Sequence, residues 1–115
     1  MDIAWTGPRA KPDAPWRYEP DLRKLAEWAD MLVIACPAAP GTEKMIDARV
    51  LAALGRDGIL VNIARGSIVD EDALIAALKA RTLGGAGLDV FEQEPTDHTR
   101  WADVPNTTLM PHIAG

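Results

Sequence analysis

Short apolar runs that alternate with helix-length segments constrain the fold of this chain more than any other feature. Four runs have the length of a β-strand: Met31–Ala35, Ile59–Ile63, Gly85–Val90 and Thr107–Met110. Between them, apolar residues recur at helical spacing in Ala48–Leu54 and Asp70–Ala80. The first of these segments has Asp47 as its expected N-cap and Gly55 at its end. Strands without polar alternation, separated by helices, predict an α/β fold whose parallel sheet is covered on both faces.

Two parts of the chain have weaker signals. In the N-terminal quarter, Asp2–Thr6 predicts a strand, and Leu22–Trp28 predicts a short helix whose N-cap is Asp21. Arg17–Tyr18 could form a very short strand before that helix. The run Gly85–Val90 contains glycines, which we interpret as places where a helix packs closely on the sheet.

Composition and charge exclude several classes of protein. The 115 residues suffice for one domain with a core of its own. The formal charge of −5 argues against a nucleic-acid surface, which requires a basic face. No apolar run approaches the roughly 20 residues that span a bilayer, and the first residues do not resemble a secretion signal. Cys36 is the single cysteine, which excludes an internal disulfide and suits a reducing cytosol. We therefore expect a cytoplasmic domain without membrane or nucleic-acid partners.

Polar side chains follow three successive predicted strands at their carboxyl ends. Arg65 follows the second strand and His112 follows the last. In the third run, Asp89 ends the strand Gly85–Leu88, and Glu94 lies in the loop after it. Ligands of open parallel sheets bind outside this edge. An arginine that grips a carboxylate, an imidazolium that gives a proton to a carbonyl oxygen and a carboxylate that orients the imidazole are the groups needed to reduce a 2-keto acid.

Each of these residues also has an ordinary interpretation. Arg65 could be a surface charge in a turn, Glu94 a solvated loop acid, and His112 a packed or exposed spacer. Periodicity alone favours the ordinary interpretations, and the coincidence of the three residues at one edge makes the two interpretations about equally supported.

Three long motifs resemble the D-isomer-specific 2-hydroxyacid dehydrogenase family. They read VIACPAAPGT from Val33, LVNIARGSIVDEDALIAAL from Leu60, and GAGLDVFEQEP from Gly85 with PHIAG at the end of the chain. Arg65 and Glu94 lie 29 residues apart, and Glu94 and His112 lie 18 apart, as in that family. The resemblance implies that Arg65 binds the substrate carboxylate and carbonyl, that His112 is the acid/base, and that Glu94 is its partner.

The resemblance also implies an NAD(P) cofactor and the residues around it. The implied contacts are Cys36, Pro37 and Thr42 near the adenosine and ribose, and Ile63, Ala64, Arg65, Asp89, His112 and Gly115 near the nicotinamide. NAD-specific members usually end the strand corresponding to Asp2–Thr6 with an acid. Here the turn contains Gly7 and Arg9 without an acid, and similar turns occur in NADPH-preferring glyoxylate/hydroxypyruvate reductases. We therefore expect NADP(H) to be favoured over NAD(H).

The phosphate-binding fingerprint G-x-G-x-x-G is absent from the sequence, since Val90 occupies the sixth position of the only near match. We therefore expect residues 1–115 to be part of an NAD(P)-binding domain, a doubly wound Rossmann-type sheet without its first strand and without a substrate domain. The strands at Asp2–Thr6 and Met31–Ala35 are then expected to expose unpaired edges or to pair imperfectly with each other.

The expected function is that of part of an oxidoreductase that transfers hydride between NAD(P)H and a 2-keto acid, with glyoxylate or hydroxypyruvate favoured. We expect the isolated chain to be inactive and the full-length protein to be a homodimer. A phosphoglycerate- or phosphonate-type dehydrogenase is the alternative within this class. A dinucleotide-sensing co-repressor and a non-functional remnant are alternatives from other classes.

Overall fold

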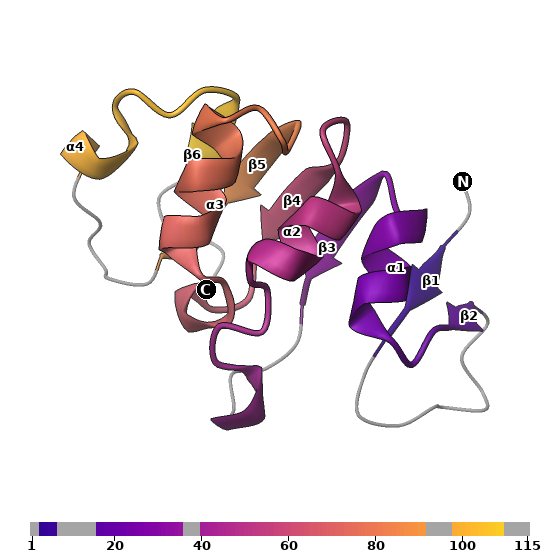
Figure 1. Cartoon of the computed structure of the whole chain (residues 1–115). Coiled ribbons are helices and arrows are strands. Elements are labelled where there is room, and N and C mark those ends of the chain that lie inside the picture. Colours follow the sequence, from indigo (N-terminus) through magenta and orange to yellow (C-terminus); the bar gives the residue numbers. More distant parts are fainter. Residues whose placement is uncertain (1–2, 7–15, 36–39, 92–97, 110–115) are drawn as a thin grey trace.

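A computed structural model describes residues 3–6, 16–35, 40–91 and 98–109 of the chain. The strands are β1 (Ala4–Trp5), β2 (Arg17–Tyr18), β3 (Met31–Ile34), β4 (Ile59–Asn62), β5 (Gly85–Leu88) and β6 (Thr107–Leu109). The α-helices are α1 (Leu22–Trp28), α2 (Ala48–Leu54), α3 (Glu71–Lys79) and α4 (His98–Trp101). Two 3₁₀ turns complete the set, η1 (Pro40–Thr42) and η2 (Gly66–Ile68). The alternation of strands and helices predicted from the sequence is confirmed (Figure 1).

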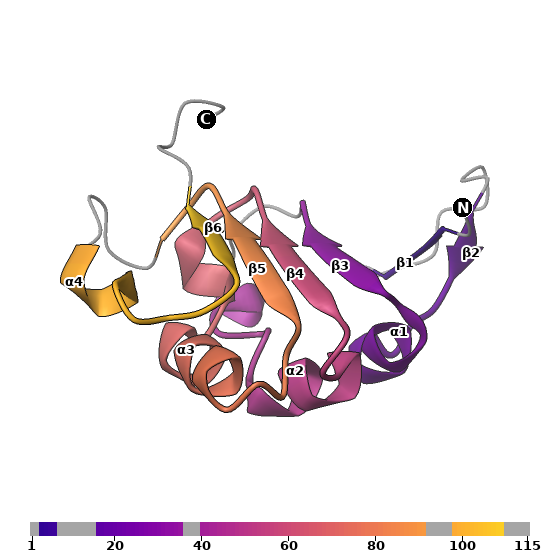
Figure 2. The ribbon, with the colours of Figure 1, turned by 90° about the horizontal axis from the view of Figure 1, so that it is seen from above.

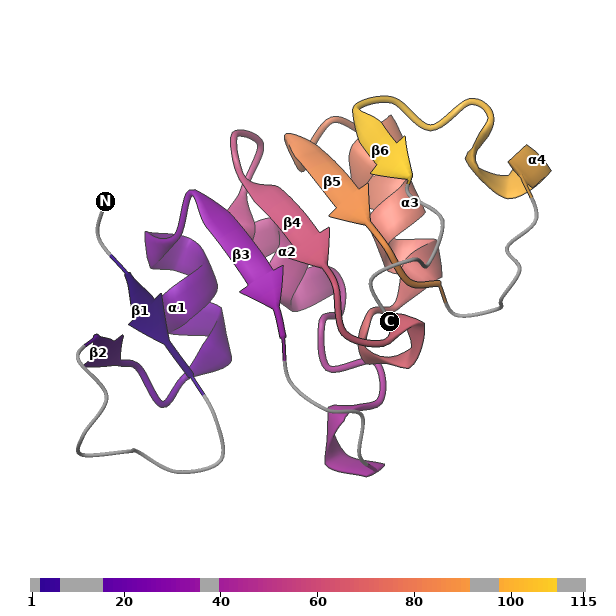
Figure 3. The same cartoon turned by 180° about the vertical axis from the view of Figure 1, so that it is seen from behind.

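The strands form two parallel sheets. The larger has the order β3-β4-β5-β6, and Leu60 at its centre pairs with Leu32 on one side and Ala86 on the other. The smaller sheet joins β1 to β2 and lies beyond β3, away from β4 (Figure 3). Within the described residues β1 and β3 are not paired, so both strands keep a free edge in the middle of the arrangement. The expectation of unpaired edges at these two strands is therefore confirmed.

Helices cover only one face of the larger sheet within the described residues. Figure 2 shows α1, α2 and α3 on one side of the strands. Side chains on that side are buried, among them Leu32, Ile34, Leu60 and Leu88, whereas Met31, Val33 and Ile59 on the other side are exposed. The expectation that helices cover both faces is therefore wrong for the part of the chain that the structure describes.

The one-sided cover follows from the order of the strands. From β3 to β5 each new strand is added on the same side of the last, through a helix. Because such crossovers are right-handed, strands that are added in one direction place their helices on the same face. Covering the second face requires helical connections between strands added in the opposite direction, and the described residues contain no such connection.

The glycines of β5 lie on the open face rather than under a helix. Gly85 pairs with Ile59 and Gly87 with Val61, and these residues line a shallow depression of about 320 Å³ on that face. The residue that faces the helices is Ala86, which is buried. Within the described part of the chain, the interpretation of these glycines as points of close helix packing is therefore wrong.

An aspartate caps the start of each of three helices. The sequence predicts Asp21 and Asp47 as N-caps, and the third, Asp70, begins the predicted helical segment Asp70–Ala80. Asp21 and Asp47 each accept hydrogen bonds from two backbone N–H groups of α1 and α2, and Asp70 accepts one from Ala73 in α3. Gly55 ends α2 with φ +89°, a conformation that other residues rarely adopt. The short helices therefore have the capping that isolated helices of this length need.

Replacing the cap of α2 is expected to destabilise the chain modestly. The Asp47 carboxylate accepts from Arg49 N at 3.0 Å and Val50 N at 3.2 Å. We expect Asp47→Ala to lower the free energy of unfolding by about 1 kcal/mol, because these donors lose their acceptor. Urea unfolding followed by circular dichroism measures the change, with Asp57→Ala at an exposed turn as the control. Equal midpoints for the two variants would contradict the capping role.

Helix α4 was not predicted from the sequence, because contacts with distant residues hold it. Arg100 places Nε 3.2 Å from Glu71 Oε1 and Nη2 2.7 Å from Asp72 Oδ1, at the start of α3. The Trp101 ring meets the Phe91 ring edge-on, with centroids 6.0 Å apart. Neither set of contacts leaves a periodic signal within the four residues of the helix.

Candidate active site

The turn after β4 presents Arg65 at the carboxyl end of the strand. Asn62, the last residue of β4, accepts a hydrogen bond at Oδ1 from Ala64 N at 3.0 Å and donates from Nδ2 to Arg65 O at 2.9 Å. The Arg65 carbonyl also accepts from Ile68 N at 3.3 Å, where η2 begins. The exposed Arg65 side chain donates from Nη1 to Ala64 O at 2.8 Å. A basic side chain is thus held at the edge where the sequence predicts the substrate site.

The end of β5 is tied to the same turn. Asp89 follows β5 directly, is only 4% exposed, and donates its backbone N–H to Asn62 O at 3.1 Å. Parallel strands end at a common edge, so Arg65 and Asp89 belong to neighbouring loops at that edge. The structure thus places both residues at this edge, and their roles in a site stay predictions.

The loop after β3 joins this edge as well. Lys44 N donates to Ser67 O at 2.8 Å, and Ile46 forms a parallel bridge to Val69. Thr42, in η1, accepts at its carbonyl from Met45 N at 3.1 Å. The loops after three consecutive strands are therefore connected by hydrogen bonds. Ile63 is half exposed beside them.

Seven of the predicted site residues lie outside the described residues: Gly7, Arg9, Cys36, Pro37, Glu94, His112 and Gly115. The approach of Arg65, Glu94 and His112 to one another therefore stays a prediction. The described site residues are Thr42, Ile63, Ala64, Arg65 and Asp89, and all of them lie at or after the carboxyl ends of strands.

Asn62 is the site residue that the sequence reasoning missed. The run ILVNI predicts an apolar strand, and Asn62 is the only polar residue in it. A polar residue that ends a buried strand just before an arginine is the signal that identifies it. Its side chain is 1% exposed, and such a group needs hydrogen bonds to be tolerated in the core.

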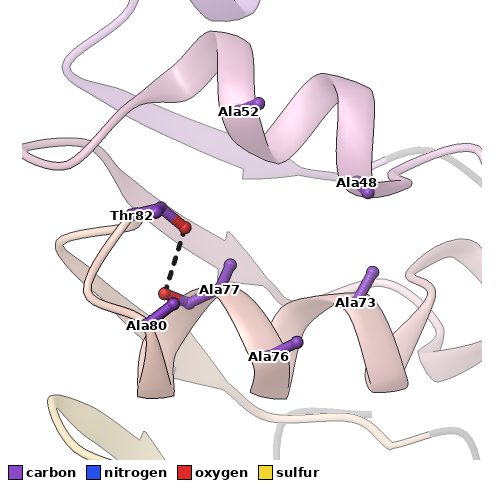
Figure 4. Close-up of a pocket in the computed structure, with 7 residues that line it drawn as sticks. All are labelled: Ala48, Ala52, Ala73, Ala76, Ala77, Ala80 and Thr82. Carbon is purple, nitrogen blue, oxygen red and sulfur yellow. Dashed lines mark hydrogen bonds between the residues drawn. The ribbon is translucent and has the colours of Figure 1, made fainter.

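A groove between α2 and α3 is a weaker candidate for a binding site. It has a volume of about 290 Å³ and is lined by Ala48, Ala52, Ala73, Ala76, Ala77, Ala80 and Thr82 (Figure 4). Its single polar side chain is already used, since Thr82 Oγ1 donates to Ala77 O at 3.3 Å. A groove of this composition offers no groups for catalysis.

The described residues also limit other possibilities. Among those residues, no group of histidine, cysteine or acidic side chains is arranged to hold a metal ion. Over the same ranges, every helix is too short or too polar to cross a lipid bilayer.

Comparison with known proteins decides the family. Residues 1–114 match the family model described as "D-isomer specific 2-hydroxyacid dehydrogenase, NAD binding domain". The chain belongs to the D-isomer-specific 2-hydroxyacid dehydrogenases. The strand ends described above are therefore part of a nicotinamide cofactor domain, and the resemblance drawn from the sequence motifs is confirmed.

Curated and solved relatives agree with this family. The chain is 46% identical over 114 residues to the 2-ketogluconate reductase of Gluconobacter oxydans, covering 99% of the chain and 37% of the relative. It is 47% identical over 103 residues to a glyoxylate/hydroxypyruvate reductase of Arabidopsis thaliana, covering 90% of the chain and 33% of the relative.

The NADPH-dependent glyoxylate/hydroxypyruvate reductase of Sinorhizobium meliloti, solved with NADP and malonate, superposes with a TM-score of 0.94. It is 42% identical, over 99% of this chain and 36% of that one. The chain thus spans about a third of the length of these dehydrogenases, and its Rossmann-like α/β fold is confirmed.

Proposed function

We propose that this chain supplies the part of an NAD(P)-binding domain that carries the reaction centre of a reductase acting on 2-keto acids. The observation that carries the proposal is the turn at Asn62–Arg65, which holds a guanidinium at the carboxyl end of β4. A guanidinium binds a carboxylate through two parallel charge-assisted hydrogen bonds. Glyoxylate and hydroxypyruvate are the favoured substrates, because both the Arabidopsis and the Sinorhizobium relatives are named for them.

The proposed roles follow from the chemistry of each side chain. Arg65 binds the substrate carboxylate and polarises the carbonyl group beside it. His112 donates a proton to the carbonyl oxygen, and Glu94 orients the imidazole and favours its protonated form. The spacing of Arg65, Glu94 and His112 along the chain supports these roles, because it resembles the spacing of the corresponding residues in the family.

The described residues fit a nicotinamide cofactor at this edge. Asp89 is a buried carboxylate at the end of β5, suited to accept a hydrogen bond from a carboxamide NH₂. The backbone of Ile63–Arg65 lies at the end of the adjacent strand, and Thr42 lies in η1, in the loop that we propose faces the adenosine. When bound, the cofactor supplies the hydride that the reduction requires.

We propose that NADPH is preferred to NADH, and that residues 1–115 do not turn over substrate alone. The sequence Gly7–Arg9 lacks an acid and contains a cation of the kind that suits a 2′-phosphate. The sequence also contains no G-x-G-x-x-G motif for the pyrophosphate. Reduction of glyoxylate with NADPH by the 115 residues alone would overturn the second proposal. We also propose that the full-length protein is a homodimer and lies in the cytoplasm. Light scattering of the purified protein measures its oligomeric state.

A segment exchange tests the proposed function. We would replace the matching 36% of the Sinorhizobium reductase with this chain, and we call the product the hybrid reductase. We expect it to reduce glyoxylate or hydroxypyruvate and to bind NADPH more tightly than NADH in a fluorescence titration. A folded hybrid that binds NADPH without reducing any 2-keto acid would contradict the function. Tighter binding of NADH would contradict the cofactor preference alone.

A further inference from the structure

Asn62 is a polar residue at a position where an apolar one would pack. Its side chain shares the helix-covered face of the sheet with Leu60, and both are almost completely buried. Burying a carboxamide costs free energy unless its donor and acceptor find partners. The neighbouring strands have Ile34 and Leu88 in register with it. Core packing alone therefore favours an apolar residue at this position.

The partners of Asn62 both lie in the turn that contains Arg65. Its carboxamide oxygen accepts a hydrogen bond from the Ala64 N–H at 3.0 Å, and its NH₂ group donates one to the Arg65 carbonyl at 2.9 Å. The Ala64 carbonyl in turn accepts from the Arg65 guanidinium at 2.8 Å. One side chain thus fixes the 63–64 and the 65–66 peptide groups. The Ala64 carbonyl, which accepts from the guanidinium, belongs to the peptide group between them.

We propose that Asn62 is a positioning residue for the reaction, which fixes the direction in which Arg65 presents its guanidinium to a substrate carboxylate. The proposal rests on the proposed function. Arg65 has an extended backbone, with φ −147° and ψ 140°, and its side chain is exposed. If the carboxamide is removed, the described contacts that still hold this turn are the backbone hydrogen bonds donated by Ile63, Ile68 and Asp89. A guanidinium displaced by about 1 Å can cost on the order of 10²-fold in rate.

The test uses Asn62→Leu in the hybrid reductase. Leucine has a similar size and suits the apolar face, so we expect a melting temperature within about 5 °C of the parent. We expect the KM for glyoxylate to rise about 10- to 100-fold. The Kd for NADPH should rise by a smaller factor, because the backbone of residues 63–65 is only one part of the proposed cofactor site. Ser67→Ala, an exposed side chain just after the turn, is the control and should change neither value. An unchanged KM in a folded Asn62→Leu variant would overturn the proposal.

A double variant separates positioning from a merely structural role. If Asn62 acts through Arg65, then Asn62→Leu should add less than about twofold to the KM of Arg65→Lys, because residues that act as a unit are not additive. Independent, multiplying effects would overturn the proposal.

Hydrogen exchange of the 115-residue chain gives a second readout that does not depend on turnover. The Ala64 amide should exchange at least about 10-fold faster in Asn62→Leu than in the parent. Unchanged exchange would overturn the proposal. A parent hybrid without activity would contradict the proposed function instead, and the exchange rate would still decide the role of Asn62 in the turn.

Discussion

Replacing Arg65 with alanine in the hybrid reductase is expected to lower kcat/KM for glyoxylate by roughly 10²- to 10³-fold. The guanidinium is the one described cation at the turn after β4, where substrate is proposed to bind. Losing it removes two charge-assisted hydrogen bonds to the substrate carboxylate. NADPH affinity should change little, because alanine leaves the backbone of residues 63–65 in place. Steady-state kinetics and a cofactor titration measure the two effects.

Two further variants make this result specific. Arg65→Lys keeps the charge but not the two-pronged geometry, so it should recover only a small part of the loss. Arg56→Ala removes an exposed arginine before the other end of β4 and should leave kcat/KM near the parent value. Equal losses for Arg56→Ala and Arg65→Ala would show that overall charge, rather than the turn, governs activity.

The second large effect concerns the core. Leu60 lies on β4 in the middle of the four-stranded sheet and is completely buried under the helices. We expect Leu60→Ala to lower the free energy of unfolding of the 115-residue chain by about 2–5 kcal/mol, through lost burial and the cavity left behind. That loss is a large share of the roughly 5–15 kcal/mol that stabilises an ordinary domain. Urea unfolding followed by circular dichroism measures it.

Met31 provides the matched control for Leu60. Its side chain is similar in size, but it lies on the open face of β3 and is 55% exposed. Met31→Ala should cost less than about 1 kcal/mol, since little burial is lost. Similar losses for Leu60→Ala and Met31→Ala would mean that both faces of the sheet are buried in the isolated chain.

The sequence was sufficient for the parts of the fold that local patterns control. Runs such as the one containing Leu60 predict strands because apolar residues need burial, and aspartates such as Asp47 mark helix starts because their side chains satisfy free N–H groups. The position of Arg65 followed from its place just after a strand. Each of these signals lies within a few residues of the element it predicts.

Features that depend on distant contacts were not predictable in this way. Helix α4 is held by Arg100 against Glu71 and by Trp101 against Phe91, and neither pair is close in sequence. The one-sided cover of the sheet depends on the direction in which strands are added, whereas the strands themselves are apolar along both faces. The sequence marks Asn62 as the polar residue at the end of an apolar strand, but its hydrogen-bond partners are needed to show that it shapes the turn.

The central claim is that the strand ends of this chain bind the carboxylate of a 2-keto acid through Arg65. A crystal structure of the hybrid reductase with NADP and malonate tests it most directly, because the Sinorhizobium relative has been solved with both. We predict two Arg65 nitrogens within about 2.7–3.2 Å of one malonate carboxylate, with His112 and Glu94 beside the ligand. Ordered malonate held by other residues, with Arg65 and His112 on opposite sides of the domain, would contradict the claim.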